Sequence, residues 1–131
     1  MDMIRQMDMS YSYKPVLIKA VLLYADDKGR IKLDNIVSYF KSYYEGRRAA
    51  GLPVEKKNSI FAKGGYTDKE VERNILSNPF KRFEDMQILR HTKTLGIVQV
   101  DEAVWKHLTK SELAEIEKIC DEKLDIYYSR F

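Results

Sequence analysis

Residues 77–100, SNPFKRFEDMQILRHTKTLGIVQV, constrain the fold more than any other stretch of this chain. Asn78 suits a helix N-cap, and Pro79 follows at the first helical position, where its missing N–H leaves no hydrogen bond unmade. The apolar residues of 88–100 flank a turn at 93–96 and predict two paired strands. The stretch therefore predicts a short amphipathic helix that leads into a β-hairpin. The buried face of this helix is predicted to consist of Phe80, Phe83 and Met86.

A complementary pattern lies nearer the N-terminus. Residues 16–25 are apolar on nearly every side, which predicts a central, buried helix. Residues 30–33 alternate polar and apolar, as in a short strand, and Asp34 is predicted to cap a helix over 35–49. Helix, strand and helix, followed by helix and hairpin, is the element order of a winged helix-turn-helix. We therefore predict one mainly α (α+β) domain over residues 1–131, a winged helix-turn-helix with a small β-hairpin wing.

Two irregular segments accompany this unit. Residues 1–13 fit either a flexible lead-in or a short helix packed by Met1, Ile4 and Met7. Residues 50–66 contain glycines and a proline that forbid a continuous helix, so they predict a long loop insertion. The apolar residues of this loop are expected to pack on the core; they are Leu52, Val54, Ile60 and Phe61.

Further helices are predicted on both sides of the hairpin. Thr67 and Glu70 form the T-x-x-E capping box of one helix, and Asp101 is predicted to cap another. Ser111 is predicted to cap a final helix that ends near Ser129. The apolar stripe of that extra C-terminal helix consists of Leu113, Ile116, Cys120, Leu124 and Tyr127, widened by Ile119 and Ile126.

The composition describes a globular protein with a mildly basic balance. Hydrophobic residues make up 44% of the 131 residues, which excludes disorder, and the net charge is +3. The single cysteine, Cys120, rules out an internal disulfide and suits a reducing compartment. No apolar run approaches the ~20 residues of a membrane span, and the start lacks the apolar core of a signal peptide. We expect a cytoplasmic protein that has no membrane segment.

No constellation of catalytic or metal-binding residues is visible. His91 and His107 stand alone, outside any spacing that binds a metal. Cys120 lies on the apolar stripe of the last predicted helix, where a buried, inert thiol is expected. We therefore expect a protein that is not an enzyme and has no cofactor and no metal.

Basic residues supply the candidate site. Between residues 39 and 66 there are six bases against two acids, interleaved with aromatic residues, as on surfaces that bind a single strand. The predicted helix and wing after residue 77 add further cations that could contact DNA. Alternatively, these are solvated faces in which Lys81 pairs with Asp85. The candidate nucleic-acid-binding residues are Arg47, Arg48, Lys56, Lys57, Lys63, Lys81, Arg82, Arg90 and Lys93.

Four stretches carry a resemblance to a known group of proteins: SYKPVLIKAVL, GLPVEKKNSIFAK, NILSNPFKRFEDM and VWKHLTKSELAEIEKICDEKLDIYYSRF. Together they resemble the C-terminal accessory region of bacterial superfamily 2 (DEAD/DEAH-type) helicase proteins. Some of those proteins carry a phospholipase-D-like nuclease domain and act in restriction and defence. The resemblance implies an accessory module of a DNA-acting machine. The chain has no helicase motor motif, so we expect either a fragment or a small stand-alone relative.

Two functions follow as hypotheses. The first is a non-catalytic nucleic-acid-binding or substrate-positioning module, whose partner is duplex or single-stranded DNA, within or beside a helicase or nuclease. The second is a protein–protein docking or homodimerisation module, including a small inhibitor of a nucleic-acid enzyme. The excess of basic residues between residues 39 and 66 favours the first hypothesis. The balanced charge of residues 78–87 favours the second.

Overall fold

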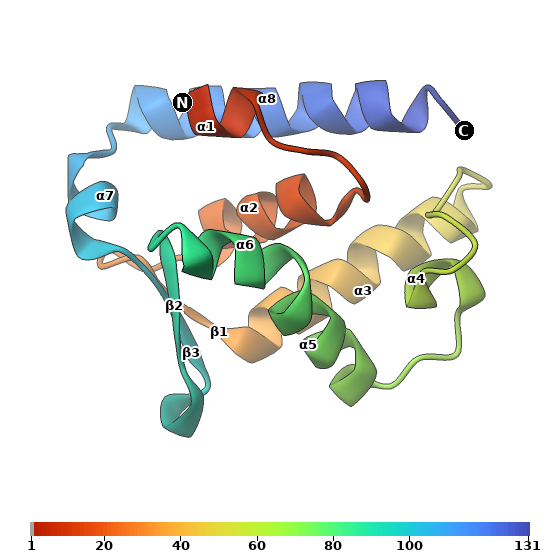
Figure 1. Cartoon of the computed structure of the whole chain (residues 1–131), viewed down its shortest axis with the longest axis horizontal. Helices are drawn as coiled ribbons and strands as arrows, with labels where there is room; N and C mark the ends of the chain where they lie inside the picture. The colour runs from red at the N-terminus through yellow and green to blue at the C-terminus, as the bar shows by residue number, and fades with distance from the viewer. Residues whose placement is uncertain (1) are drawn as a thin grey trace.

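Helices surround a small antiparallel sheet in the computed structural model, which describes residues 2–131 (Figure 1). The predicted α+β class and the extra C-terminal helices are confirmed. In chain order the elements are α1 (Asp2–Arg5), α2 (Tyr13–Tyr24), β1 (Arg30–Lys32), α3 (Leu33–Ala49), α4 (Ile60–Lys63), α5 (Asp68–Ser77), α6 (Pro79–Asp85), β2 (Leu89–Thr92), the 3-10 helix η1 (Lys93–Leu95), β3 (Ile97–Val100), α7 (Glu102–His107) and α8 (Lys110–Tyr128).

The sheet joins the two halves of the predicted pattern. Its strand order is β1-β3-β2, and both pairs are antiparallel. β2 and β3 form the predicted hairpin, closed by η1 and by Gly96 in the left-handed conformation. β1 comes from far upstream and pairs with β3, with Ile31 opposite Val98. Both side chains are buried on the face that packs against the helices.

The core lies around α2, which packs against α3, α6 and α8. Figure 1 shows α8 running along one side of the molecule with α1 beside it, while the hairpin projects at the opposite side. Phe40 and Tyr44 of α3 and Phe61 of α4 are completely buried, and the rings of Tyr44 and Phe61 stack at a centroid distance of 4.3 Å. Of the two alternatives left open for residues 1–13, the structure has the short helix, α1, and Ile4 of this helix is buried.

The insertion at 50–66 is held to the core by a buried carboxylate. Glu55 is 7% exposed and accepts hydrogen bonds from the backbone N–H of Ser12 and from the hydroxyl of Tyr127. Phe61 is buried as predicted, whereas Leu52 is 49% exposed. The insertion therefore packs on the fold through Glu55 and Phe61 and leaves its tip in solvent.

Several local predictions are wrong. Met86 is 36% exposed because α6 ends at Asp85 and Gln87 turns the chain with a φ of 60°. Ile126 is 57% exposed, outside the buried stripe of α8.

Two predicted caps also differ from the structure. Asp34 lies inside the first turn of α3, whose N-cap is Lys32. Thr109, and not Ser111, caps α8, in a capping box with Glu112. The capping box of Thr67 and Glu70 is confirmed. Of the three residues predicted to pack the N-terminal helix, Met1 lies outside the described residues.

Within residues 2–131, no helix combines the length and the apolar character that crossing a membrane requires.

Candidate nucleic-acid interface

The nine predicted cations do not gather on one surface. The C-terminal end of α3, the loop after it and α4 lie at one end of the molecule, and the β2–β3 hairpin lies at the other (Figure 1). The cations of residues 47–63 and those of the hairpin, Arg90 and Lys93, therefore belong to separate surfaces. α6, which carries Lys81 and Arg82, lies between them.

Arg47 and Arg48 have bonding partners elsewhere in the fold, although the side chain of Arg48 is exposed. The Nε of Arg47 donates to the carbonyl of Pro53 at 2.6 Å, and its guanidinium carbon lies 3.5 Å from the centroid of the Tyr128 ring. Arg48 forms an ion pair with Glu45 and donates to the carbonyl of Phe61. Both guanidinium groups therefore have partners that hold the insertion against α3 and α8.

The three lysines of the insertion, Lys56, Lys57 and Lys63, are exposed. The ammonium nitrogen of Lys56 lies 5.1 Å from the centroid of the Tyr11 ring, within the range of a cation–π contact. Lys57 and Lys63 form no ion pair with any residue of 2–131. These two side chains remain a candidate surface for a polyanion.

Acidic neighbours neutralise part of α6. The ammonium of Lys81 lies 3.0 Å from the carboxylate of Asp85 and 3.8 Å from that of Glu84. Its hydrogen bond to Asp85 raises the pKa of Lys81. Arg82 is exposed and forms no ion pair with the described residues. α6 thus offers one unpaired cation beside two carboxylates, a weak surface for phosphate.

The outer face of the sheet carries a second set of cations. Because side chains alternate along a strand, Arg30 and Lys32 of β1 point away from the buried Ile31. Arg90 of β2 is exposed likewise, and it lies on the same face because Gln99 of β3 pairs with both arginines. Sequence reasoning found Arg90 and missed Arg30 and Lys32. The alternation of residues 30–32 was visible, but the partner of that strand was not.

Lys93 extends this set beyond the end of β2. It opens η1 at the tip of the hairpin and is exposed. Lys32, Arg90 and Lys93 form no ion pair within residues 2–131, whereas Arg30 contacts Asp26 at 3.1 Å. The pKa of Asp26 is lowered by hydrogen bonds from the backbone and side chain of Arg30 and from the backbone of Lys28. We call Arg30, Lys32, Arg90 and Lys93 the outer sheet cations.

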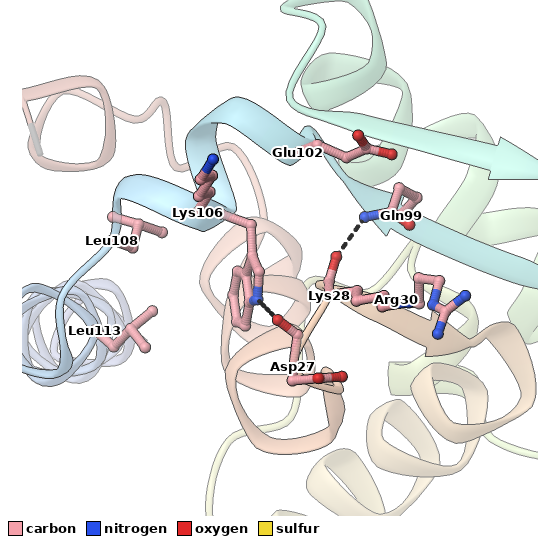
Figure 2. A pocket seen from close by; sticks show the side chains of 9 residues that line it. Asp27, Lys28, Arg30, Gln99, Glu102, Lys106, Leu108 and Leu113 are labelled. Carbon is pink, nitrogen blue, oxygen red and sulfur yellow. Dashed lines mark hydrogen bonds between the residues drawn. The ribbon is translucent and has the colours of Figure 1, made fainter.

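A polar pocket of about 790 Å³ borders the outer sheet cations at Arg30 (Figure 2). The indole N–H of Trp105 donates to the carbonyl of Asp27 at 3.2 Å, and the side-chain amide of Gln99 donates to the carbonyl of Lys28 at 2.7 Å. The pocket lies between β1, β3, α7 and the start of α8. Its lining consists of Asp27, Lys28, Arg30, Gln99, Glu102, Trp105, Lys106, Leu108 and Leu113.

The residues weighed for catalysis are placed as follows. His91 is half-buried, with its ring edge-on to Phe80 at a centroid distance of 6.1 Å. His107 is exposed at the end of α7. Cys120 is fully buried, and burial raises the pKa of its thiol to about 12. Within residues 2–131, no three side chains of the metal-binding types lie together.

No protein-family model, curated protein or solved structure matches this chain.

Proposed function

We propose that this chain is a winged helix-turn-helix module that binds nucleic acid through the outer sheet cations. The order of its elements supports the proposal: α2, β1, α3, the α5–α6 pair, β2 and β3 follow one another as in that fold. The first strand lies beside the last, which supports the assignment of the β2–β3 hairpin as the wing. The wing of such modules contacts the nucleic-acid backbone while a helix approaches the groove.

One observation carries the functional part of the proposal. Four cations from two separate segments lie on one face of the sheet and its tip, and three of them have no acidic partner within residues 2–131. A row of unpaired cations neutralises phosphates and releases counterions, which is the main source of affinity for nucleic acid. Such contacts fix the orientation of a strand without reading its sequence.

The resemblance to the accessory regions of superfamily 2 helicases supports a role beside a DNA-acting motor or nuclease. In that setting the module holds DNA and does no chemistry of its own. DNA is therefore the partner we propose, and the outer sheet cations position it. Lys57 and Lys63 belong to a separate surface at the far end of the molecule, which is the alternative site of contact.

A docking or dimerisation module is the second candidate. The observation that favours it is the neutral surface of α6, where Glu84 and Asp85 compensate Lys81. Leu95, which is 69% exposed at the hairpin tip, adds an apolar contact of the kind that interfaces bury.

Fluorescence anisotropy with a labelled oligonucleotide tests the proposal. We expect Lys32→Ala with Arg90→Ala to weaken binding by about tenfold, because two phosphate contacts are lost. The matched control is Lys57→Ala with Lys63→Ala, which removes the same charge from the opposite end. A larger loss in the control pair would move the interface to the insertion. Absence of binding at low salt would overturn the proposal and leave the docking candidate.

A further inference from the structure

The polar pocket beside the sheet continues the surface of the outer sheet cations. Arg30 belongs to both, and Gln99 lies between Arg30 and Arg90 in the sheet. A strand whose phosphates contact the two arginines therefore passes the mouth of the pocket. Figure 2 shows Arg30 and Gln99 on one wall and Lys106 of α7 across from them.

The size of the pocket fits a single unpaired nucleotide. Its volume of about 790 Å³ lies in the range of sites that enclose small organic molecules. The bases of a duplex are paired and stacked inside the helix, so a base must leave the stack before it can enter such a pocket. Proteins that recognise single strands instead take splayed-out bases into pockets.

Gln99 supplies an acceptor with a fixed orientation. Its side chain is 7% exposed, and its Nε2 donates to the carbonyls of both Lys28 and Val100 at 2.7 Å. These two bonds leave no freedom to exchange the oxygen and nitrogen of the amide. Its Oε1 accepts no hydrogen bond from residues 2–131 and is not sealed from solvent. An unpartnered, solvent-accessible acceptor of fixed orientation matches an amino group on a base edge.

Trp105 forms a rigid wall of the same pocket. Its ring packs on Gly29 so closely that a Cβ there would lie 2.8 Å from the Cγ of the indole. Its N–H is bonded to the carbonyl of Asp27, so the ring is fixed on two sides. Trp105 is also the only tryptophan of the chain, so tryptophan fluorescence reports on the surroundings of this one side chain, which lines this pocket and the apolar pocket beside α2.

The charges of the pocket lining suit an uncharged nucleobase inside the pocket and phosphates outside it. Lys28, Arg30 and Lys106 face Asp27 and Glu102, so the pocket itself is close to electroneutral. A bare phosphate gains little in such a lining, because its attraction to the cations is offset by the two carboxylates. A nucleobase has no net charge and carries both donors and acceptors.

From these observations we infer that the pocket takes one unpaired, amino-bearing nucleobase of a single strand whose phosphates lie along Arg30 and Arg90. The inference rests on the proposed function, because the strand is held by the outer sheet cations. It adds a preference for single strands over duplex. It also adds a preference for cytosine over thymine, since the amino group of cytosine can donate to Oε1 of Gln99 where thymine presents a carbonyl.

Titration of the Trp105 fluorescence with oligonucleotides of equal length tests the inference. The ligands are a cytosine strand, a thymine strand, an abasic strand, a blunt duplex and free cytidine monophosphate. We expect the cytosine strand to change the emission and to bind about fivefold or more tightly than the thymine strand, the effect of one base-edge hydrogen bond. The abasic strand should bind through its phosphates and leave the emission unchanged.

Two charge-reversal variants test whether the cytosine strand binds beside the pocket. Lys106→Glu alters an exposed residue of the pocket rim, and Lys118→Glu makes the same change on the exposed face of α8. We expect Lys106→Glu to weaken binding of the cytosine strand several-fold more than Lys118→Glu does. Both residues are exposed, so neither change is expected to prevent folding.

The outcomes separate this inference from the proposed function. Strand binding with an unchanged Trp105 emission, equal affinity for cytosine and thymine strands, or tighter binding of blunt duplex overturns the inference and leaves nucleic-acid binding intact. Saturation by free cytidine monophosphate at lower concentration than by the strand also overturns it, since the ligand is then a free nucleotide. No binding of any oligonucleotide overturns both.

Discussion

The backbone N–H of Ser12 donates to Oε2 of Glu55 at 2.9 Å, which joins the start of α2 to the middle of the insertion. The hydroxyl of Tyr127 donates to the other carboxylate oxygen, so a buried anion also fastens the end of α8. Tyr44 extends the network through the hydroxyl of Ser12 at 2.6 Å. Because every member is bonded, the network specifies how three distant segments meet.

Removing this carboxylate should destabilise the fold. Glu55→Ala leaves the N–H of Ser12 and the hydroxyl of Tyr127 buried without an acceptor, which we expect to cost about 3 kcal/mol of unfolding free energy. Urea denaturation monitored by circular dichroism measures the change. Glu122→Ala, on the exposed face of α8, is the control and should cost less than about 0.5 kcal/mol. Equal effects of the two substitutions would mean that Glu55 is not buried.

Two glycine substitutions should act in opposite directions. Gly29 has a φ of +78°, and a Cβ there meets Trp105, so Gly29→Ala should destabilise the fold by about 1–3 kcal/mol. Gly46 lies inside α3 with nothing within 4 Å of an added Cβ. Gly46→Ala should therefore stabilise it by about 0.5–1 kcal/mol. Thermal melts of both variants against the wild type provide the test, and a stabilising Gly29→Ala would contradict the packing of Trp105.

Truncation of Phe83 and of Met86 should destabilise the fold to different extents. Phe83 is 2% exposed, and Phe83→Ala should cost about 3–5 kcal/mol through lost burial and the cavity left behind. Met86 lies just beyond the end of the helix and is 36% exposed, so Met86→Ala should cost less than about 1 kcal/mol. Denaturant midpoints measure both. A cost for Met86→Ala comparable to that for Phe83→Ala would place Met86 in the core.

Cys120 should resist thiol reagents until the chain unfolds. Burial raises the pKa of its thiol from 9.0 to about 12, so the thiolate is scarce in the folded state at neutral pH. The neutral form is favoured by folding, so its contribution to stability is present below pH 9 and is lost as pH rises to about 12. Labelling rates with and without denaturant measure the protection.

The matching pH experiment compares the wild type with Cys120→Ala. The unfolding free energy of the wild type should fall more steeply above pH 9. Tyr13, whose pKa burial raises to about 12, titrates in the same range in both proteins, so the difference between the two isolates Cys120. Parallel curves would show that the thiol titrates alike in the folded and unfolded states.

Sequence reasoning succeeded where structure depends on near neighbours. The capping box of Thr67 and Glu70, the proline that opens α6 and the turn of the hairpin are all set by residues within a few positions of one another. The error at Met86 arose because the regular spacing was extended past the end of α6. Thr109 and Ser111 both precede the apolar stripe of α8, and only Thr109 has a glutamate three residues later to complete a capping box.

The candidate site was harder to predict because it depends on long-range pairing. Arg30 and Arg90 share a face only because β1 and β2 both pair with β3. The internal partners of Arg47, the carbonyl of Pro53 and the ring of Tyr128, are likewise brought to it by folding. A count of basic residues along the chain cannot distinguish cations that face solvent from cations that hold a loop in place.

The most direct test of nucleic-acid binding by the sheet is the salt dependence of the affinity for a single strand. The wild type and the Lys32→Ala, Arg90→Ala variant are compared by anisotropy across a range of salt concentrations. Each lost phosphate contact lowers the slope of log K against log salt by about 0.7, so the double variant should lose about 1.4. An unchanged slope with reduced affinity would contradict phosphate contact by these residues, and no binding at low salt would contradict the account as a whole.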